Sequence, residues 1–322
     1  MSLAYVKSLS SLLKSPFSGP LEPALVNIQS PLYRPKYFGE LIRGMARRHR
    51  PDFAQSIAPA NARVQYSELD QKNWHRFVAH RAEQLQAPLT YYNSAGAFCL
   101  FKILADLQIN FSTILHLRAS IELTSPLEAV EPDSVYYLTM RLIEVIPRKS
   151  QCILVMRSEL SDKQGTVLRV HKDYWFVKKC PPALLQALSP EQELLADEFR
   201  GLSKTQAQWP SWNPATLIKR SRTLHPRAGQ HYGYISGDHN VIHTTHWGAR
   251  MCGQKRPFLQ GFGLMNLALH EATQARGKAP QKLSVTFARP ALVGQELTFF
   301  FGSSQFEICD EQGKLLAFGL YN

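Results

Sequence analysis

The sequence lacks several of the patterns by which common protein classes are recognised. It contains no run of eighteen apolar residues, so a transmembrane helix is excluded. Its five cysteines are scattered without a Cys-x-x-Cys pair, which argues against a disulfide framework or a zinc ribbon and favours a reducing compartment. A serine nucleophile elbow, Gly-x-Ser-x-Gly, and a dinucleotide-binding turn, Gly-x-Gly-x-x-Gly, are also absent. Neither class of enzyme is therefore indicated.

A metal centre is not indicated either, although four histidines lie close together in the second half of the chain. These are His231, His239, His243 and His246. Imidazoles at close spacing are common zinc ligands, but no His-Glu-x-x-His motif and no partnering cysteine accompany them here. We expect neither a metal ion nor another cofactor.

Acidic residues are too few to balance the basic ones. The 322-residue chain has 37 Lys and Arg against 25 Asp and Glu, a net charge of +12. Such a charge favours an acidic partner, and nucleic acid, an anionic membrane, coenzyme A and acyl carrier protein all qualify. The most basic stretch, Arg34 to Arg50, has apolar residues at helical spacing and is predicted to be an amphipathic helix. It lacks the interleaved aromatics that bind single strands, so nucleic acid is not expected as a partner.

The first twenty residues contain no acidic residue, two lysines and several leucines. Lys7 and the serines interrupt the continuous apolar core that a secretory signal needs. The absence of arginine in this stretch disfavours a mitochondrial presequence. We expect a short surface segment and a cytoplasmic protein, with the mitochondrial matrix as the alternative.

One stretch, Tyr234 to Met265, concentrates residues that can transfer a proton. An apolar segment closes on Ser-Gly, and a loop then carries a carboxylate, Asp238, an amide, Asn240, and an imidazole, His243. Because Asp238 and His243 lie five residues apart, a loop folded back on itself lets both side chains face one water molecule. Asn240 can hydrogen-bond the loop backbone and hold its bend.

A glycine, Gly261, begins an apolar helix after this loop. A helix N-terminus has free amide hydrogens and the positive end of the helix dipole, and the missing Cβ lets a substrate oxygen approach closely. Such a donor stabilises an enolate or oxyanion. Together with the Asp238 loop, this glycine indicates addition of water to, or its elimination from, an activated acyl group.

The stretch resembles the signature of the MaoC-like acyl dehydratases, the (R)-specific enoyl-CoA hydratase branch of the hotdog superfamily. That signature runs Tyr-x-x-x-Ser-Gly-Asp-x-Asn-Pro-Ile-His. The matching residues here are Tyr232, Ser236, Gly237, Asp238, Asn240, Ile242 and His243, followed by Ala249, Arg250, Gly253, Gly261 and the segment Phe287 to Pro290. Val241 replaces the usual proline, and Gln260 replaces the histidine that precedes the helix glycine.

The resemblance implies a hydro-lyase that reversibly hydrates trans-2-enoyl thioesters to (R)-3-hydroxyacyl thioesters. The residues expected to be catalytic are Asp238, His243 and Gly261, and those expected to bind substrate are Ser236, Asn240 and Gln260. The thioester partner is predicted to be an acyl-CoA or acyl carrier protein thioester. The alternative is a non-catalytic acyl-thioester binding or scaffolding protein that keeps the same fold.

The resemblance also implies an α+β fold of the double hotdog type, in which each antiparallel sheet wraps a central helix. Residues 1–60 are predicted to form an N-terminal extension with the basic helix, 61–180 a degenerate first hotdog, 181–212 a linker and 213–322 the catalytic hotdog. Apolar runs predict a helix at 91–107 with strands at 114–123, 134–146, 151–160 and 166–177, then a helix at 261–275 with strands at 215–224, 281–288, 295–302, 305–309 and 314–320.

His116 lies on one of the first-half strands with no carboxylate nearby in sequence, so we expect it to be structural. The assembly is predicted to be a monomeric pseudo-dimer or a homodimer.

Overall fold

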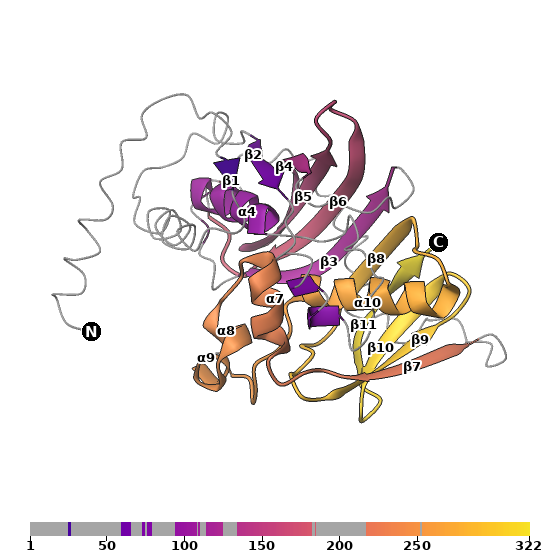
Figure 1. Cartoon of the computed structure of the whole chain (residues 1–322). Helices are drawn as coiled ribbons and strands as arrows, with labels where there is room; N and C mark the ends of the chain where they lie inside the picture. Colours follow the sequence, from indigo (N-terminus) through magenta and orange to yellow (C-terminus); the bar gives the residue numbers. More distant parts are fainter. Residues whose placement is uncertain are drawn as a thin grey trace.

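Figure 1 shows the computed structural model of the chain, which describes residues 25–26, 59–65, 73–74, 76–78, 94–107, 109, 114–124, 134–181, 184, 217–251 and 253–322. The predicted basic helix at 34–50, most of the N-terminal extension and nearly all of the linker at 181–212 lie outside these residues.

The first half of the chain builds antiparallel strands from its apolar runs. In sheet order they are β2 (Ala60–Gln65), β4 (Val135–Arg148), β5 (Gln151–Ser161), β6 (Val167–Val177) and β3 (Ile114–Leu123), and β1 (Leu25–Val26) pairs in parallel with β2 at the edge. Buried and partly exposed side chains alternate along β6, as expected for a strand with one face on a core. The strands predicted between 114 and 177 are therefore confirmed.

The second half repeats this arrangement. Its sheet order is β7 (Ile218–Thr223), β9 (Glu296–Phe301), β10 (Gln305–Asp310), β11 (Leu315–Tyr321) and β8 (Lys282–Phe287). If the five strands of each half are numbered in chain order from β2 or from β7, their order in the sheet is one, three, four, five, two in both halves. The chain is thus duplicated at the level of strand topology.

The same turn chemistry joins the equivalent strands of the two halves. Between β5 and β6, Asp162 Oδ1 accepts hydrogen bonds from the amides two and four residues later, at 2.9 and 2.8 Å. Between β10 and β11, Asp310 Oδ1 accepts from the amides at the same two positions, again at 2.9 and 2.8 Å. These side chains satisfy the turn backbone locally and set the hairpin register.

The two halves join edge to edge through β3 and β8. These strands pair antiparallel, from Arg118 opposite Thr286 to Glu122 opposite Lys282. Among the described residues, the result is one 11-stranded sheet. Because β3 and β8 are the second strand of their respective halves, the pairing relates the halves by an approximate two-fold rotation.

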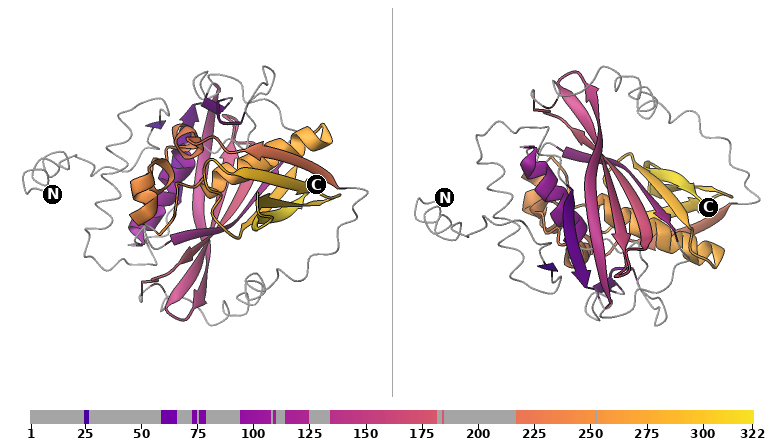
Figure 2. Two further views of the ribbon diagram at one scale, coloured as in Figure 1. Left: turned by 90° about the horizontal axis from the view of Figure 1, so that it is seen from below. Right: turned by 90° about the horizontal axis from the view of Figure 1, so that it is seen from above.

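One long helix packs on the sheet in each half. These helices are α4 (Ser94–Asp106) and α10 (Gly261–Arg276), close to the predicted helices at 91–107 and 261–275. Three shorter helices, α7 (Ala228–Ser236), α8 (Val241–Thr244) and α9 (His246–Met251), follow β7 and lie together beside α4, as Figures 1 and 2 show. No helix in the described ranges is long and apolar enough to cross a membrane.

Candidate active site

The apolar segment before Asp238 is the helix α7, which ends at Ser236. Gly237 has a φ of 73°, a left-handed conformation that favours glycine, and its amide closes the helix on the carbonyl of Gly233. The buried Ser236 hydroxyl donates to the carbonyl of Tyr232 at 3.0 Å and accepts from the Asp238 amide at 3.2 Å. A glycine and a short hydroxyl side chain thus fix where Asp238 leaves the helix.

Asn240 holds the bend of the following loop, as predicted. It is the N-cap of α8, and its side chain accepts from the Ile242 amide at 3.3 Å. Asp238 Oδ1 in turn accepts from the Asn240 amide at 3.1 Å. The expectation that His243 lies in the loop is wrong, because the Asn240 cap starts a helical turn that carries His243 round toward Asp238.

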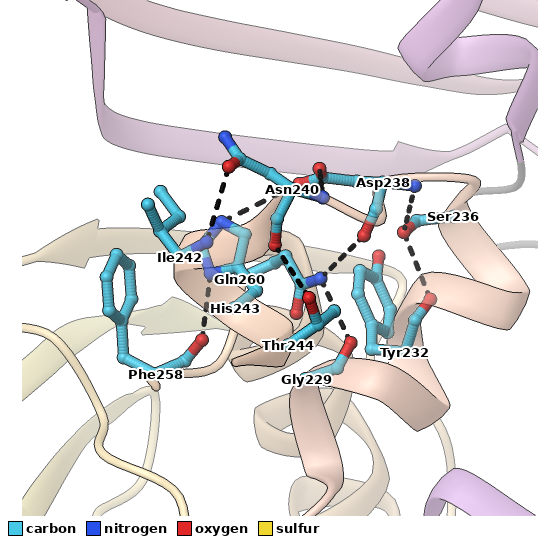
Figure 3. Close-up of polar contacts among 10 residues, drawn as sticks. All are labelled: Gly229, Tyr232, Ser236, Asp238, Asn240, Ile242, His243, Thr244, Phe258 and Gln260. Carbon is cyan, nitrogen blue, oxygen red and sulfur yellow. Dashed lines mark hydrogen bonds and ion pairs between the residues drawn. The ribbon is translucent and has the colours of Figure 1, made fainter. Parts of the chain in front are cut away.

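Asp238 and His243 face each other (Figure 3). Asp238 Oδ2 lies 3.6 Å from His243 Nε2, and the two side chains are 28% and 10% exposed. His243 Nδ1 lies 2.8 Å from the carbonyl oxygen of Phe258, and since a carbonyl only accepts, Nδ1 carries a proton. In neutral His243 the lone pair of Nε2 therefore points toward Asp238. A separation of 3.6 Å is longer than a direct hydrogen bond, so the two atoms are spaced to bind one small polar group together.

Helices α7 and α8 lie in close contact, and Gly229 makes that contact sterically feasible. A Cβ placed on Gly229 would lie 2.0 Å from the carbonyl oxygen of His243. This glycine was not among the residues predicted to form the site. It brings the backbone of His243 against the helix whose far end carries Asp238.

Gln260 lies inside the protein, 4% exposed, directly before α10. Its Nε2 donates to the carbonyls of Asp238 at 3.0 Å and Gly229 at 3.2 Å (Figure 3). Two carbonyl acceptors require the amide nitrogen on that side, so Oε1 points elsewhere and has no hydrogen-bond partner among the described residues. Gln260 therefore ties the Asp238 loop to α7 and to the start of α10.

The residues predicted to bind substrate all contact backbone in this structure. These are Ser236, Asn240 and Gln260. Each holds the loop that carries Asp238, and direct contact with substrate stays a prediction for all three.

The first turn of α10 presents uncapped amides. Its first intrahelical bond runs from the Leu264 amide to the Gln260 carbonyl, and the Gln260 side chain caps none of the preceding amides. A Cβ placed on Gly261 would lie 2.8 Å from His116 Nδ1 and 3.3 Å from the Phe287 ring. Glycine is required here because one strand from each half, β3 and β8, fills the adjacent space.

Sequence reasoning missed the charged group behind His116. His116 Nε2 lies 3.0 Å from Asp173 Oδ1, and His171 Nε2 lies 3.2 Å from the same oxygen. His116 and Asp173 are 57 positions apart, so local patterns could not reveal the pair, but β3 pairs with β6 and places His116 opposite Trp175. Burial opposes ionisation of Asp173, yet the two imidazoles outweigh it and lower its pKa to about 2. Burial lowers the pKa of His171.

Comparison with known proteins places the fold. No known family matches the sequence, and no curated protein resembles it significantly. A MaoC-like dehydratase from Phytophthora capsici superposes with a TM-score of 0.60 at 15% identity, over 84% of this chain and 99% of its own. A Mycobacterium tuberculosis protein described as a double hotdog gives a TM-score of 0.50 at 10% identity, over 80% of this chain and 92% of its own. The fold is a double hotdog.

The full-length peroxisomal multifunctional enzyme type 2 of Drosophila melanogaster gives a TM-score of 0.59 at 15% identity and covers 100% of this chain. The chain spans 57% of the length of that fly enzyme. At sequence identities this low, the superpositions establish the hotdog fold alone. The chemistry has to be argued from the site.

The site combines two chemical features, a carboxylate–imidazole pair and a helix start with uncapped amides, near the contact between the two hotdogs. A carboxylate facing an imidazole lone pair can take and return a proton, and the uncapped amides of α10 can stabilise a negative oxygen. Across the described part of the chain, no three His, Cys, Asp or Glu side chains group as a metal site.

Proposed function

We propose that the protein reversibly hydrates trans-2-enoyl thioesters to (R)-3-hydroxyacyl thioesters. The observation that carries the proposal is the 3.6 Å separation of Asp238 Oδ2 and His243 Nε2, with His243 Nδ1 fixed on a backbone carbonyl. This geometry suits a water molecule bound by both side chains. Fold likeness to a MaoC-like dehydratase agrees with this reaction class, although one fold hosts many functions.

In the hydration direction, the bound water loses a proton to the Asp238 and His243 pair as its oxygen bonds to C3. The electrons of the C2=C3 double bond move toward the thioester carbonyl, whose oxygen accepts a hydrogen bond from the Gly261 amide as enolate charge develops. The pair then delivers a proton to C2 and returns to its starting state. One water is added and no oxidant or reductant is consumed. The two proton transfers belong to the pair as a coupled unit.

The acyl carrier is coenzyme A or acyl carrier protein, both of which are acidic. A net charge of +12 suits either carrier. Acyl-CoA is the simpler probe because its enoyl group absorbs in the ultraviolet and loses that absorbance on hydration.

The test is the rate at which the purified full chain bleaches trans-2-decenoyl-CoA. Oxidation of the product by an (R)-specific but not an (S)-specific 3-hydroxyacyl-CoA dehydrogenase identifies the stereochemistry. Asp238→Asn and His243→Ala should each lower kcat by about 10² or more, the usual scale for an acid or base group. Asp310→Asn and exposed His246→Ala are matched controls that should retain activity.

A binding or scaffolding protein gives a different result. It would bind the thioester without bleaching its enoyl absorbance, even at stoichiometric excess of protein. That outcome would refute the proposed hydration.

A further inference from the structure

The first hotdog places a charged pair against the start of the second hotdog's helix. His116 Nδ1 lies 2.8 Å from the position of a Cβ on Gly261. Standard bond lengths then put this nitrogen within about 5 Å of the Gly261 amide nitrogen. Two donors that close can both reach one oxygen atom at hydrogen-bond distance.

Asp173 determines which nitrogen of His116 faces Gly261. His116 Nε2 donates to Asp173 Oδ1 at 3.0 Å, and the two side chains are 9% and 2% exposed. Because the carboxylate is ionised, Nε2 keeps its proton and Nδ1 is the nitrogen beside α10. Protonated His116 therefore has an Nδ1–H to donate there. The other titratable or charged groups of this cluster are His171 and Arg169, both on β6.

Aromatic side chains surround the His116 ring and hold its orientation. Trp175 stacks on the ring with centroids 4.1 Å apart and planes 12° apart, and Phe262 and Phe287 lie at 4.5 and 4.8 Å. The Trp175 indole nitrogen is buried and has no hydrogen-bond partner in the part of the chain that the structure describes. Gln260 directly precedes Gly261 in the chain, and its Oε1 is likewise buried without a hydrogen-bond partner among the described residues. Buried polar atoms without partners cost free energy, which a bound polar ligand recovers.

We propose that His116 is a further catalytic residue, supplied by the hotdog that lacks the Asp238 loop. When both ring nitrogens carry a proton, Nδ1–H donates to the thioester carbonyl oxygen alongside the Gly261 amide, so that two donors stabilise the developing enolate. Asp173 is a positioning residue, which holds Nε2 and orients the ring. The inference rests on the proposed hydration and replaces the expectation that His116 is structural.

The decisive measurement is the absorbance of trans-2-decenoyl-CoA bound to the full chain carrying Asp238→Asn, which should bind the thioester without hydrating it. Hydrogen bonds to the carbonyl polarise the conjugated system and shift its absorbance to longer wavelength. Adding His116→Phe keeps an aromatic ring against Trp175 but removes the donor. The shift should then fall by about half, since one of two donors is lost, while the thioester stays bound.

Turnover gives a second readout. In the otherwise wild-type chain, His116→Phe should lower kcat by about 10² to 10³, the scale measured for one oxyanion donor, with a smaller change in KM. His116→Asn, whose amide nitrogen reaches nearly the position of Nδ1, should recover part of that loss. Asp173→Asn should alter the pH profile of kcat, because only a doubly protonated ring donates from both nitrogens and a carboxylate partner favours that form more than a neutral amide does.

A double variant distinguishes a loss of the donor from a loss of folding. His116→Phe leaves the Asp173 carboxylate with one imidazole neighbour, and His116→Phe combined with Asp173→Asn removes that imbalance. An unchanged spectral shift, or wild-type kcat in a folded His116→Phe protein, would overturn the proposal. If the wild-type chain hydrates no thioester, the proposed reaction fails, yet the bound spectrum still decides whether His116 contacts the carbonyl.

Discussion

Replacing Gln260 with leucine removes the amide that ties the Asp238 loop to its surroundings. The lost hydrogen bonds run to the carbonyls of Asp238 at 3.0 Å and Gly229 at 3.2 Å. Gly229 lies inside α7, where the helix pattern supplies a second donor, so the larger penalty falls on Asp238. A buried carbonyl without a partner costs about 1 to 3 kcal/mol, and losing the second bond costs about 1 kcal/mol more.

Leucine also removes an existing defect, because Gln260 Oε1 is buried without a partner in the described structure. This relief returns roughly 1 to 2 kcal/mol. The middle of these ranges gives a net loss in the free energy of unfolding of about 1.5 kcal/mol, or a fall in Tm of about 2 °C for a chain of 322 residues. The loss in kcat should be larger, about 10-fold to 10²-fold, because a catalytic group displaced by about 1 Å reacts much more slowly.

The measurements are thermal unfolding by circular dichroism and initial rates of enoyl-CoA hydration. Gln260→Glu keeps the shape but turns an oxygen toward both carbonyls, so it should lose at least as much activity as Gln260→Leu. Gln260→His supplies one ring N–H as a donor and should retain more activity than Gln260→Leu. Gln312→Leu, at an exposed turn, controls for the change of side-chain type. If Gln260→Leu melts and turns over like the wild type, the amide does not hold the loop.

Three further predictions concern pH, salt and substrate. Burial lowers the pKa of His270 to about 4, so the unfolded chain, titrating near 6.5, takes up the proton first as pH falls. Stability should drop by up to roughly 3 kcal/mol between those values, and His270→Gln should flatten the Tm profile there. KM for enoyl-CoA should rise with ionic strength, since salt screens exposed charges beyond about 8 to 10 Å; a flat KM would contradict this. Decenoyl-CoA should have a higher kcat/KM than crotonyl-CoA, because the small residues at the start of α4 leave room to bury a longer acyl chain. Gly96→Leu should reduce that advantage. A preference of the wild type for crotonyl-CoA would refute the prediction.

Local patterns were enough to predict much of the fold and the central pair of the site. Strand positions followed from apolar runs, and the Asp162 and Asp310 hydrogen bonds in the turns between strands stay within four residues. Asp238 and His243 could be placed together for the same reason, since only five positions separate them, although His243 lies on the short helix α8 and not in the loop. Interactions confined to a few residues leave a readable trace in sequence.

Contacts between distant strands and helices could not be predicted this way. The need for glycine at position 229 arises from the backbone of His243, a contact made only after α7 and α8 pack. His116 and Asp173 meet through the register of β3 with β6. Pairing the predicted strands at 114–123 and 166–177 antiparallel would have brought these residues near each other, but apolar patterns alone do not specify register.

The pairing of β3 with β8 explains why the first hotdog remains necessary although it has no Asp238-type loop. Without β3, strand β8 would present an unpaired edge, with Phe287 at its end beside Gly261. With β3 in place, that edge is closed and His116 lies next to Phe287 against Gly261. The helix that presents the amides for acyl chemistry is therefore bounded by one strand from each hotdog. A duplicated chain can keep the proton-transferring pair in one half while the other half builds the wall, and in our proposal a donor, at the same helix start.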